Sequence, residues 1–98
     1  MVEVRKTDEF ASWLDGLRDL RARARIQVRI QRMSEGNTGD AKSVGCGVFE
    51  MRVDHGPGYR VYFVRQGVLV VILLCGGDKS SQRADIALAK RLARALEE

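Results

Sequence analysis

An uninterrupted apolar run, Val68–Cys75, constrains the fold of this 98-residue chain more than any other feature. Because no side chain in the run is polar, both faces of the strand that it predicts should be covered, which places that strand inside a sheet and not at its edge. The segment Tyr59–Val64, rich in aromatic and β-branched residues, precedes it, and residues 65–67 separate the two runs. This pattern predicts a β-hairpin on which the rest of the chain packs.

Length and composition fit one domain, residues 1–98, with a single modest core. A chain that is 45% hydrophobic and 31% charged is globular rather than disordered. The longest apolar run is too short to cross a membrane, and the charged N-terminal segment does not resemble a signal peptide, so we expect a cytoplasmic protein. Cys46 and Cys75 are expected to be buried thiols in a reducing compartment, and their spacing does not suit a zinc site. We expect no metal and no cofactor.

Two segments are predicted before the central region of the chain. Val2–Lys6 alternates between apolar and charged side chains, which predicts a short strand. Thr7 is predicted to cap a helix over residues 8–16, because its hydroxyl can accept a backbone N–H and two acids follow where the helix dipole favours negative charge. Trp13 lies on the apolar stripe of this helix, so we interpret it as a packing residue rather than a platform for a nucleic-acid base.

The segment Leu17–Glu35 fits two patterns. Residues 22–31 alternate strictly between apolar and polar side chains, as in a strand. The length of the segment, its good helix formers and Gly36 at its end favour one long helix instead. Arginines lie along one side of that helix, either as a solvated face or as a surface for phosphates or an acidic partner. They are Arg18, Arg21, Arg25, Arg29 and Arg32.

The second half of the chain is predicted to hold most of the sheet. Residues 37–43 should form a polar loop, and Val48–Asp54 alternates as a half-exposed strand with one charged face. Ser80 or Ser81 should cap a final helix. The order strand, helix, helix, three strands, helix predicts an α+β fold with a small antiparallel sheet.

Three cations from neighbouring strands are predicted to converge: Arg52, Arg60 and Lys79. A structural alternative for Arg60 is an exposed residue at a sheet edge that forms an ion pair with Glu50 or Asp54, and the same alternative applies to Arg52. Lys79 follows a double glycine and precedes a helix N-terminus, where the helix dipole disfavours a cation. This placement favours a functional role for Lys79.

Three segments resemble the RelE/ParE superfamily of toxin–antitoxin toxins, and most of all its HigB-like "addiction module killer protein" branch. They are V-F-E-M-R-V-D at 48–54, G-P-G-Y-R-V-Y-F at 56–63 and V-V-I-L-L-C-G-G-D-K-S-S-Q at 70–82. The resemblance implies a small antiparallel sheet with two N-terminal helices packed on one face. It also implies a metal-independent, ribosome-dependent mRNA endoribonuclease, in which the RNA 2′-hydroxyl attacks the adjacent phosphate.

The resemblance also implies roles for individual residues and a set of partners. Arg60 matches the arginine that stabilises the phosphate, Lys79 lies where relatives place another catalytic base or cation, and Arg52 either positions RNA or holds the sheet. Candidates for proton transfer are Lys79, His55 and Tyr59. Residues expected to contact RNA are Lys42, His55, Tyr59 and Asp78. A cognate helix-turn-helix antitoxin should inhibit the protein and repress the operon, so that operator DNA is contacted only through the antitoxin.

Two other functions fit the same sequence. A ParE-like protein of the same superfamily would inhibit DNA gyrase without catalysis, and a basic RNA-binding domain would lack a catalytic step altogether. The pair Arg60 and Lys79 favours cleavage, because a developing phosphorane dianion requires cations around it.

Overall fold

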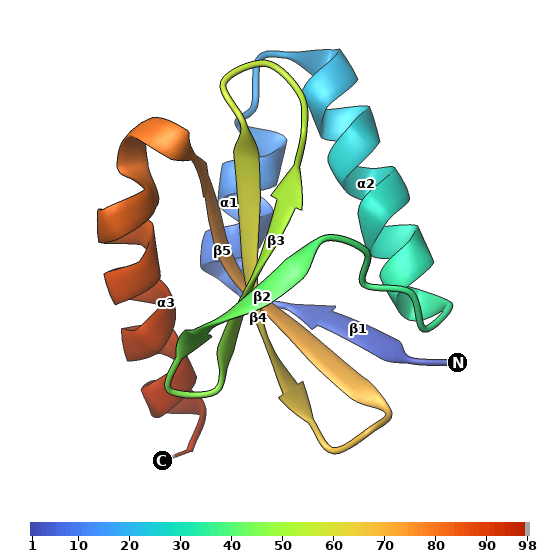
Figure 1. The fold of residues 1–98 in the computed structure, drawn as a ribbon, viewed down its shortest axis with the longest axis vertical. Helices are drawn as coiled ribbons and strands as arrows, with labels where there is room; N and C mark the ends of the chain where they lie inside the picture. The colour runs from blue at the N-terminus through green and yellow to red at the C-terminus, as the bar shows by residue number, and fades with distance from the viewer. Residues whose placement is uncertain (98) are drawn as a thin grey trace.

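The computed structural model describes residues 1–97, which form a five-stranded sheet with helices on both faces (Figure 1). In chain order the elements are β1 (Glu3–Lys6), α1 (Asp8–Asp15), α2 (Leu20–Ser34), β2 (Ala41–Gly45), β3 (Val48–Val53), β4 (Tyr59–Gln66), β5 (Val70–Asp78), the 3₁₀ turn η1 (Lys79–Ser81) and α3 (Gln82–Leu96). The strand order across the sheet is β1-β5-β4-β3-β2. The α+β class is confirmed.

The sheet is mixed, because β1 pairs with β5 in parallel whereas the other neighbouring strands are antiparallel. Two apolar clusters cover its two faces. Phe10 of α1 and Ile26 of α2 pack with Val61 and Phe63 on one face, and Ala89 of α3 packs on the other. The expected packing of the two N-terminal helices on one face is therefore confirmed, and α3 lies opposite them (Figure 1).

The central hairpin exists, but its turn is displaced along the chain. Strand β4 extends to Gln66, and the turn starts at Gly67, whose φ of 67° suits glycine. Val68 and Leu69, expected in a buried strand, lie in the turn and are 88% and 62% exposed. Strand β5 lies between β1 and β4, so its predicted place inside the sheet is confirmed.

Strand β2 does not follow from the sequence pattern, which predicts a polar loop over residues 37–43 and so includes the first three residues of this strand. Ala41 and Lys42 pair with Met51 and Glu50 of β3, at the edge of the sheet. Only Ala41 and Val44 of this strand are partly buried, so an apolar pattern is nearly absent from it. An edge strand gains much of its stability from backbone pairing, which side-chain periodicity does not report.

Cys46 lies in the tight turn from β2 to β3, so the expectation that both cysteines are buried is wrong for this residue. Cys46 has a φ of 56° and is exposed, whereas Cys75 is buried in β5. Burial raises the pKa of the Cys75 thiol to about 12.

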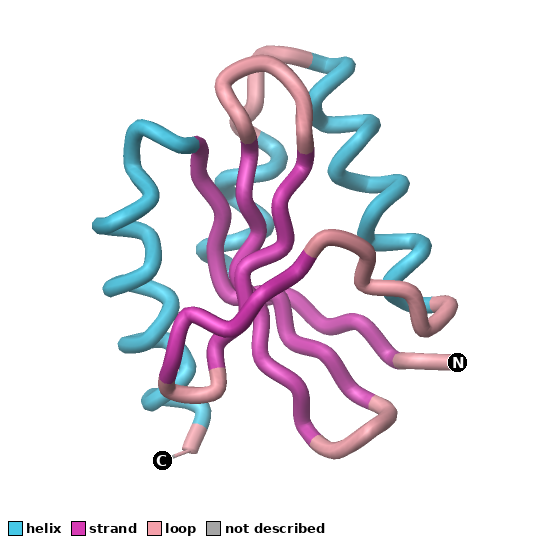
Figure 2. Tube along the Cα trace, viewed as in Figure 1, coloured by secondary structure: helices cyan, strands magenta, loops and turns pink. Residues whose placement is uncertain are grey.

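The loops that connect the strands lie at the ends of the sheet (Figure 2).

Local capping sets the helix boundaries. The Thr7 hydroxyl accepts a hydrogen bond from Phe10 N at 3.0 Å, as predicted. Helix α2 begins at Leu20 rather than Leu17, because the Asp19 carboxylate accepts from Arg21 N and Ala22 N and so caps it. The helical interpretation of this segment is confirmed. Its shorter span excludes Arg18, which was expected on the helix surface.

The double glycine in β5 allows helices to approach the strand from both faces. A side chain at Gly76 would collide with the Trp13 ring of α1. A side chain at Gly77 would collide with the Asp85 carboxylate of α3. Trp13 also packs edge-on against Tyr59, with ring centroids 6.3 Å apart, which confirms it as a packing residue. These glycines therefore fix the positions of α1 and α3 relative to the strands that carry the site.

Candidate active site

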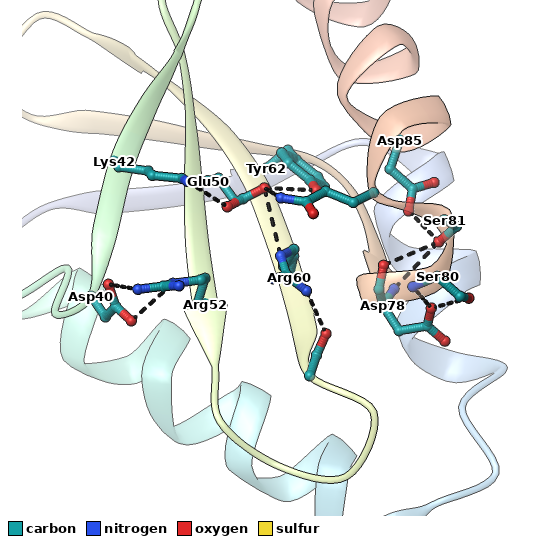
Figure 3. Close-up of polar contacts among 12 residues, drawn as sticks. Asp40, Lys42, Glu50, Arg52, Arg60, Tyr62, Asp78, Ser80, Ser81 and Asp85 are labelled. Carbon is teal, nitrogen blue, oxygen red and sulfur yellow. Dashed lines mark hydrogen bonds and ion pairs between the residues drawn. The ribbon is translucent and has the colours of Figure 1, made fainter.

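Two arginines face each other across neighbouring strands. The register places Arg52 of β3 directly opposite Arg60 of β4, and Gly77 of β5 follows on the far side of Arg60. Like charges directly opposite each other destabilise a sheet, so this pair requires compensation. Asp40 supplies it for Arg52, with Oδ2 3.1 Å from Arg52 Nε (Figure 3). Glu50 supplies it for Arg60, with Oε2 3.7 Å from Arg60 Nε.

Arg60 is held inside the protein, not at a sheet edge. It is only 9% exposed, and its Nη1 donates to the Gly58 carbonyl oxygen at 3.0 Å. The ion pair with Glu50 considered from the sequence is present, although the exposed edge position is wrong because β3 and β5 flank β4. The Arg52 side chain is half exposed and pairs with Asp40 rather than with Glu50 or Asp54.

Glu50 is fully buried, which corrects the expected exposed charged face of β3. Its Oε2 accepts hydrogen bonds from the Tyr62 hydroxyl at 3.0 Å and from Gln82 Nε2 at 2.9 Å. Lys42 Nζ lies 4.0 Å from the other carboxylate oxygen, Oε1 (Figure 3). Burial and the neighbouring carboxylate raise the pKa of Tyr62, so that its hydroxyl stays a hydrogen-bond donor.

A hollow of about 280 Å³ opens beside the two arginines. Its lining residues are Asp40, Arg52, Val53, Asp54, Gly58, Tyr59 and Arg60. Asp40 is engaged by Arg52, and among residues 1–97 no ion pair is formed by the exposed carboxylate of Asp54. The hollow thus combines two guanidinium groups with one available carboxylate.

Lys79 starts the turn after β5 and is exposed. A Cβ at Gly58 would lie 3.6 Å from Arg60 Nη1 and 3.9 Å from the Lys79 Cβ, so Lys79 begins beside the wall of the hollow. Its neighbour Asp78 caps η1 by accepting from Ser80 N at 2.8 Å. Hydrogen bonds from the Ser80 side chain and backbone lower the pKa of Asp78. Asp78 therefore has a structural partner within the chain.

The remaining predicted residues occupy different places. Tyr59 lines the hollow, and burial, with Asp19 and Asp78 nearby, raises its pKa. His55 Nε2 lies 3.2 Å from Asp19 Oδ2, and the hollow does not include His55. Lys42 is exposed on β2 next to Glu50. The structure thus gathers Arg52, Arg60 and Tyr59 at the hollow, places Lys79 at its margin, and leaves Lys42 and His55 out of its lining.

Sequence reasoning did not assign Asp40, Asp54 or Gln82 to this site, and it placed Glu50 at the surface. Asp40 precedes the strand that was not predicted, so its place beside Arg52 could not be inferred. Gln82 reaches Glu50 from α3, across a sequence separation that no local pattern reports. The alternation in residues 48–54 is the sequence pattern that could have linked Glu50 to the site, since it places Glu50, Arg52 and Asp54 on one face of the strand.

Within residues 1–97, no group of three or more His, Cys, Asp or Glu side chains could hold a metal ion. No helix in this part of the chain has the length and apolar character needed to cross a membrane.

The fold and the site together define a small α+β protein that carries two opposed arginines, one buried and one half exposed, beside a hollow at one end of its sheet. The chain matches the family of phage-derived Gp49-like proteins (DUF891) over residues 12–96 and belongs to that family. This family is associated with toxin–antitoxin systems.

Two known proteins are similar to this chain. An uncharacterized protein of Haemophilus influenzae is 54% identical over 95 residues, which cover 97% of this chain and 96% of the relative. The solution structure of the conserved hypothetical protein HP0894 from Helicobacter pylori has a similar fold, with a TM-score of 0.55 and 15% identity. That match covers 82% of this chain and 97% of the other.

Proposed function

We propose that the protein is the toxin of a type II toxin–antitoxin pair and that it cleaves mRNA on the ribosome. The observation that carries this proposal is the direct opposition of Arg52 and Arg60 at the hollow. Two guanidinium groups at one hollow can both donate hydrogen bonds to the oxygens of one RNA phosphodiester, and their attraction grows as a phosphorane dianion develops. The association of the family with toxin–antitoxin systems supports the same conclusion.

The proposed reaction is an internal phosphoryl transfer. The RNA 2′-oxygen bonds to the adjacent phosphorus, the bond from phosphorus to the 5′-oxygen breaks, and a 2′,3′-cyclic phosphate and a 5′-hydroxyl result. Negative charge builds up on the phosphorane oxygens in the transition state, where fixed cations are most effective. Arg60, largely shielded from water, supplies a positive charge beside those oxygens. The more exposed Arg52 positions the phosphate.

Proton transfer is assigned to groups at the hollow and its margin. Asp54 accepts the proton of the 2′-hydroxyl, because its carboxylate lines the hollow and has no ion-pair partner within residues 1–97. Lys79, beside Gly58, protonates the departing 5′-oxygen. His55 is not used, since it faces Asp19. The ribosome would hold the RNA in the reactive geometry, which a small open site cannot do alone.

The proposed partners follow from charge and from the family. A cognate helix-turn-helix antitoxin would hold the toxin inactive and would provide its only link to operator DNA. Helix α2 presents arginines and no acid to its surroundings, a surface suited to RNA or to an acidic segment of the antitoxin.

Inducible expression in a bacterial host, followed by primer extension on an abundant mRNA, tests the proposal. Wild-type protein should arrest growth and create new 5′ ends within translated regions. Arg52→Ala and Arg60→Lys should lose most of these ends. Arg91→Ala, an equal loss of charge on the exposed face of α3, should keep them. Arrest with intact mRNA would overturn the ribonuclease assignment and direct attention to gyrase, and absence of arrest would overturn the toxin assignment.

A further inference from the structure

Two buried polar atoms, one on each member of the Arg60–Glu50 ion pair, form no hydrogen bond. Within the described residues they are Glu50 Oε1 and Arg60 Nε, on neighbouring strands. Nearly all buried polar atoms in folded proteins have a partner, so such a pair requires an explanation. A buried ion pair that is incompletely bonded contributes little to stability, which points to a role in function.

The surroundings of Glu50 fix the direction of its carboxylate. Tyr62 from β4 and Gln82 from α3 both donate to Oε2, so this oxygen is held from two elements. The carboxylate then lies 3.7 Å from Arg60 Nε and, through Oε1, 4.0 Å from Lys42 Nζ. One fixed anion therefore lies between cations carried by β4 and by β2.

We propose that Glu50 is a positioning residue that orients Arg60 and Lys42 toward the scissile phosphate, a role that rests on the proposed function. Glu50 faces the Nε side of the Arg60 guanidinium, and the Gly58 carbonyl accepts from Nη1. Within residues 1–97 no hydrogen bond engages Nη2, which leaves this nitrogen for a phosphate oxygen. Glu50 acts only through its cations, since the carboxylate itself is inaccessible.

The long contacts around Glu50 fit this role. Distances of 3.7 Å and 4.0 Å exceed those of charge-assisted hydrogen bonds. Contacts in unliganded active sites are often long and tighten when the substrate binds. Binding of a phosphate would bring the Arg60 and Lys42 side chains closer together. The fixed Glu50 carboxylate between them would keep both side chains directed at that phosphate.

Glu50→Gln tests the proposal, because it keeps the side-chain volume and removes the charge. Two measurements are made on purified protein: the Arg60 Nε–Hε resonance by NMR, and single-turnover cleavage of mRNA on programmed ribosomes. We expect the resonance to shift and broaden, the rate at saturating toxin to fall at least tenfold, and the half-saturating concentration to change less than threefold. Glu35→Gln, the same change at an exposed site, should alter none of these.

Tyr62→Phe keeps the inference testable if Glu50→Gln fails to fold. It removes one of the two donors to Oε2 and should cause a smaller change of the same kind in both measurements. A fall in rate with an unmoved Arg60 resonance would overturn the positioning role, and so would an unchanged rate with a perturbed resonance. If wild-type protein cleaves nothing, the proposed function fails, whereas the resonance still decides whether Glu50 orients Arg60.

Discussion

The two opposed arginines differ in what their removal should do to stability. Arg52 forms a surface ion pair, and such pairs contribute about 0–1 kcal/mol. Arg60 is a partner of the buried Glu50 carboxylate. Removing one member of a buried pair leaves an uncompensated charge, which typically costs about 3–5 kcal/mol.

We therefore expect Arg60→Ala to destabilise the protein severely and Arg52→Ala to change the free energy of unfolding by less than about 1 kcal/mol. Urea denaturation followed by circular dichroism measures both variants. Equal losses in the two variants would show that Glu50 does not depend on Arg60.

Asp78 predicts a dependence of stability on pH. Hydrogen bonds from Ser80 lower its pKa in the folded protein, below the unfolded value of about 3.9. The ionised carboxylate therefore contributes stability that is fully present above the unfolded pKa and is lost as the pH falls through the folded pKa. The difference in thermal stability between wild-type and Asp78→Asn protein should be greatest near pH 7 and should shrink as the pH falls below the unfolded pKa of about 3.9. A constant difference between them would contradict this account.

Helix α1 and strand β5 meet at a position where only glycine fits. Gly76→Ala should place a methyl group against the Trp13 ring, and such overpacking typically costs about 1–3 kcal/mol. Combining it with Trp13→Leu should lose less stability than the sum of the two single changes, because the smaller side chain leaves room for the methyl. Chemical denaturation of the four proteins in this double-mutant cycle measures the coupling, and strict additivity would contradict the contact.

The position of the β4–β5 turn predicts opposite outcomes for the same substitution within one apolar run. Leu73 is 1% exposed in the core, whereas Val68 is 88% exposed in the turn. Leu73→Asp buries an unpaired charge and should abolish folding. Val68→Asp should leave the melting temperature nearly unchanged. Circular dichroism separates the two outcomes. If Val68→Asp also unfolded the protein, the result would favour the strand boundaries expected from the sequence, with Val68 inside the buried strand.

Over the whole molecule, the sequence predicts elements that have strong periodicity and misses those that depend on distant partners. The hairpin, the helices and the α+β class follow from apolar patterns that act within a few residues. Strand β2 escapes prediction because residues 41–45 form an edge that is held largely by its pairing with β3.

The candidate site divides in the same way. Alternation within β3, together with the prediction that β4 follows it as the next strand, is enough to expect that Arg52 and Arg60 converge, and the double glycine draws attention to Lys79. The burial of Glu50 cannot be predicted from the residues near it in the sequence, because it depends on Gln82 from α3 and on the strand register. Asp40 is missed for the same reason, since its contact with Arg52 requires the unpredicted strand to be in place.

The parallel pairing of β1 with β5 also determines when this protein can finish folding. Glu3 pairs with Val70, so β1 cannot take its place in the sheet until β5, the fifth strand in chain order, has been made. Closing so long a loop has an entropic cost before any contact compensates it, and such topologies fold slowly. A nascent chain on its own ribosome therefore cannot complete the sheet until residues 70–78 are available to pair. The toxin proposed here would have no complete active site before that point.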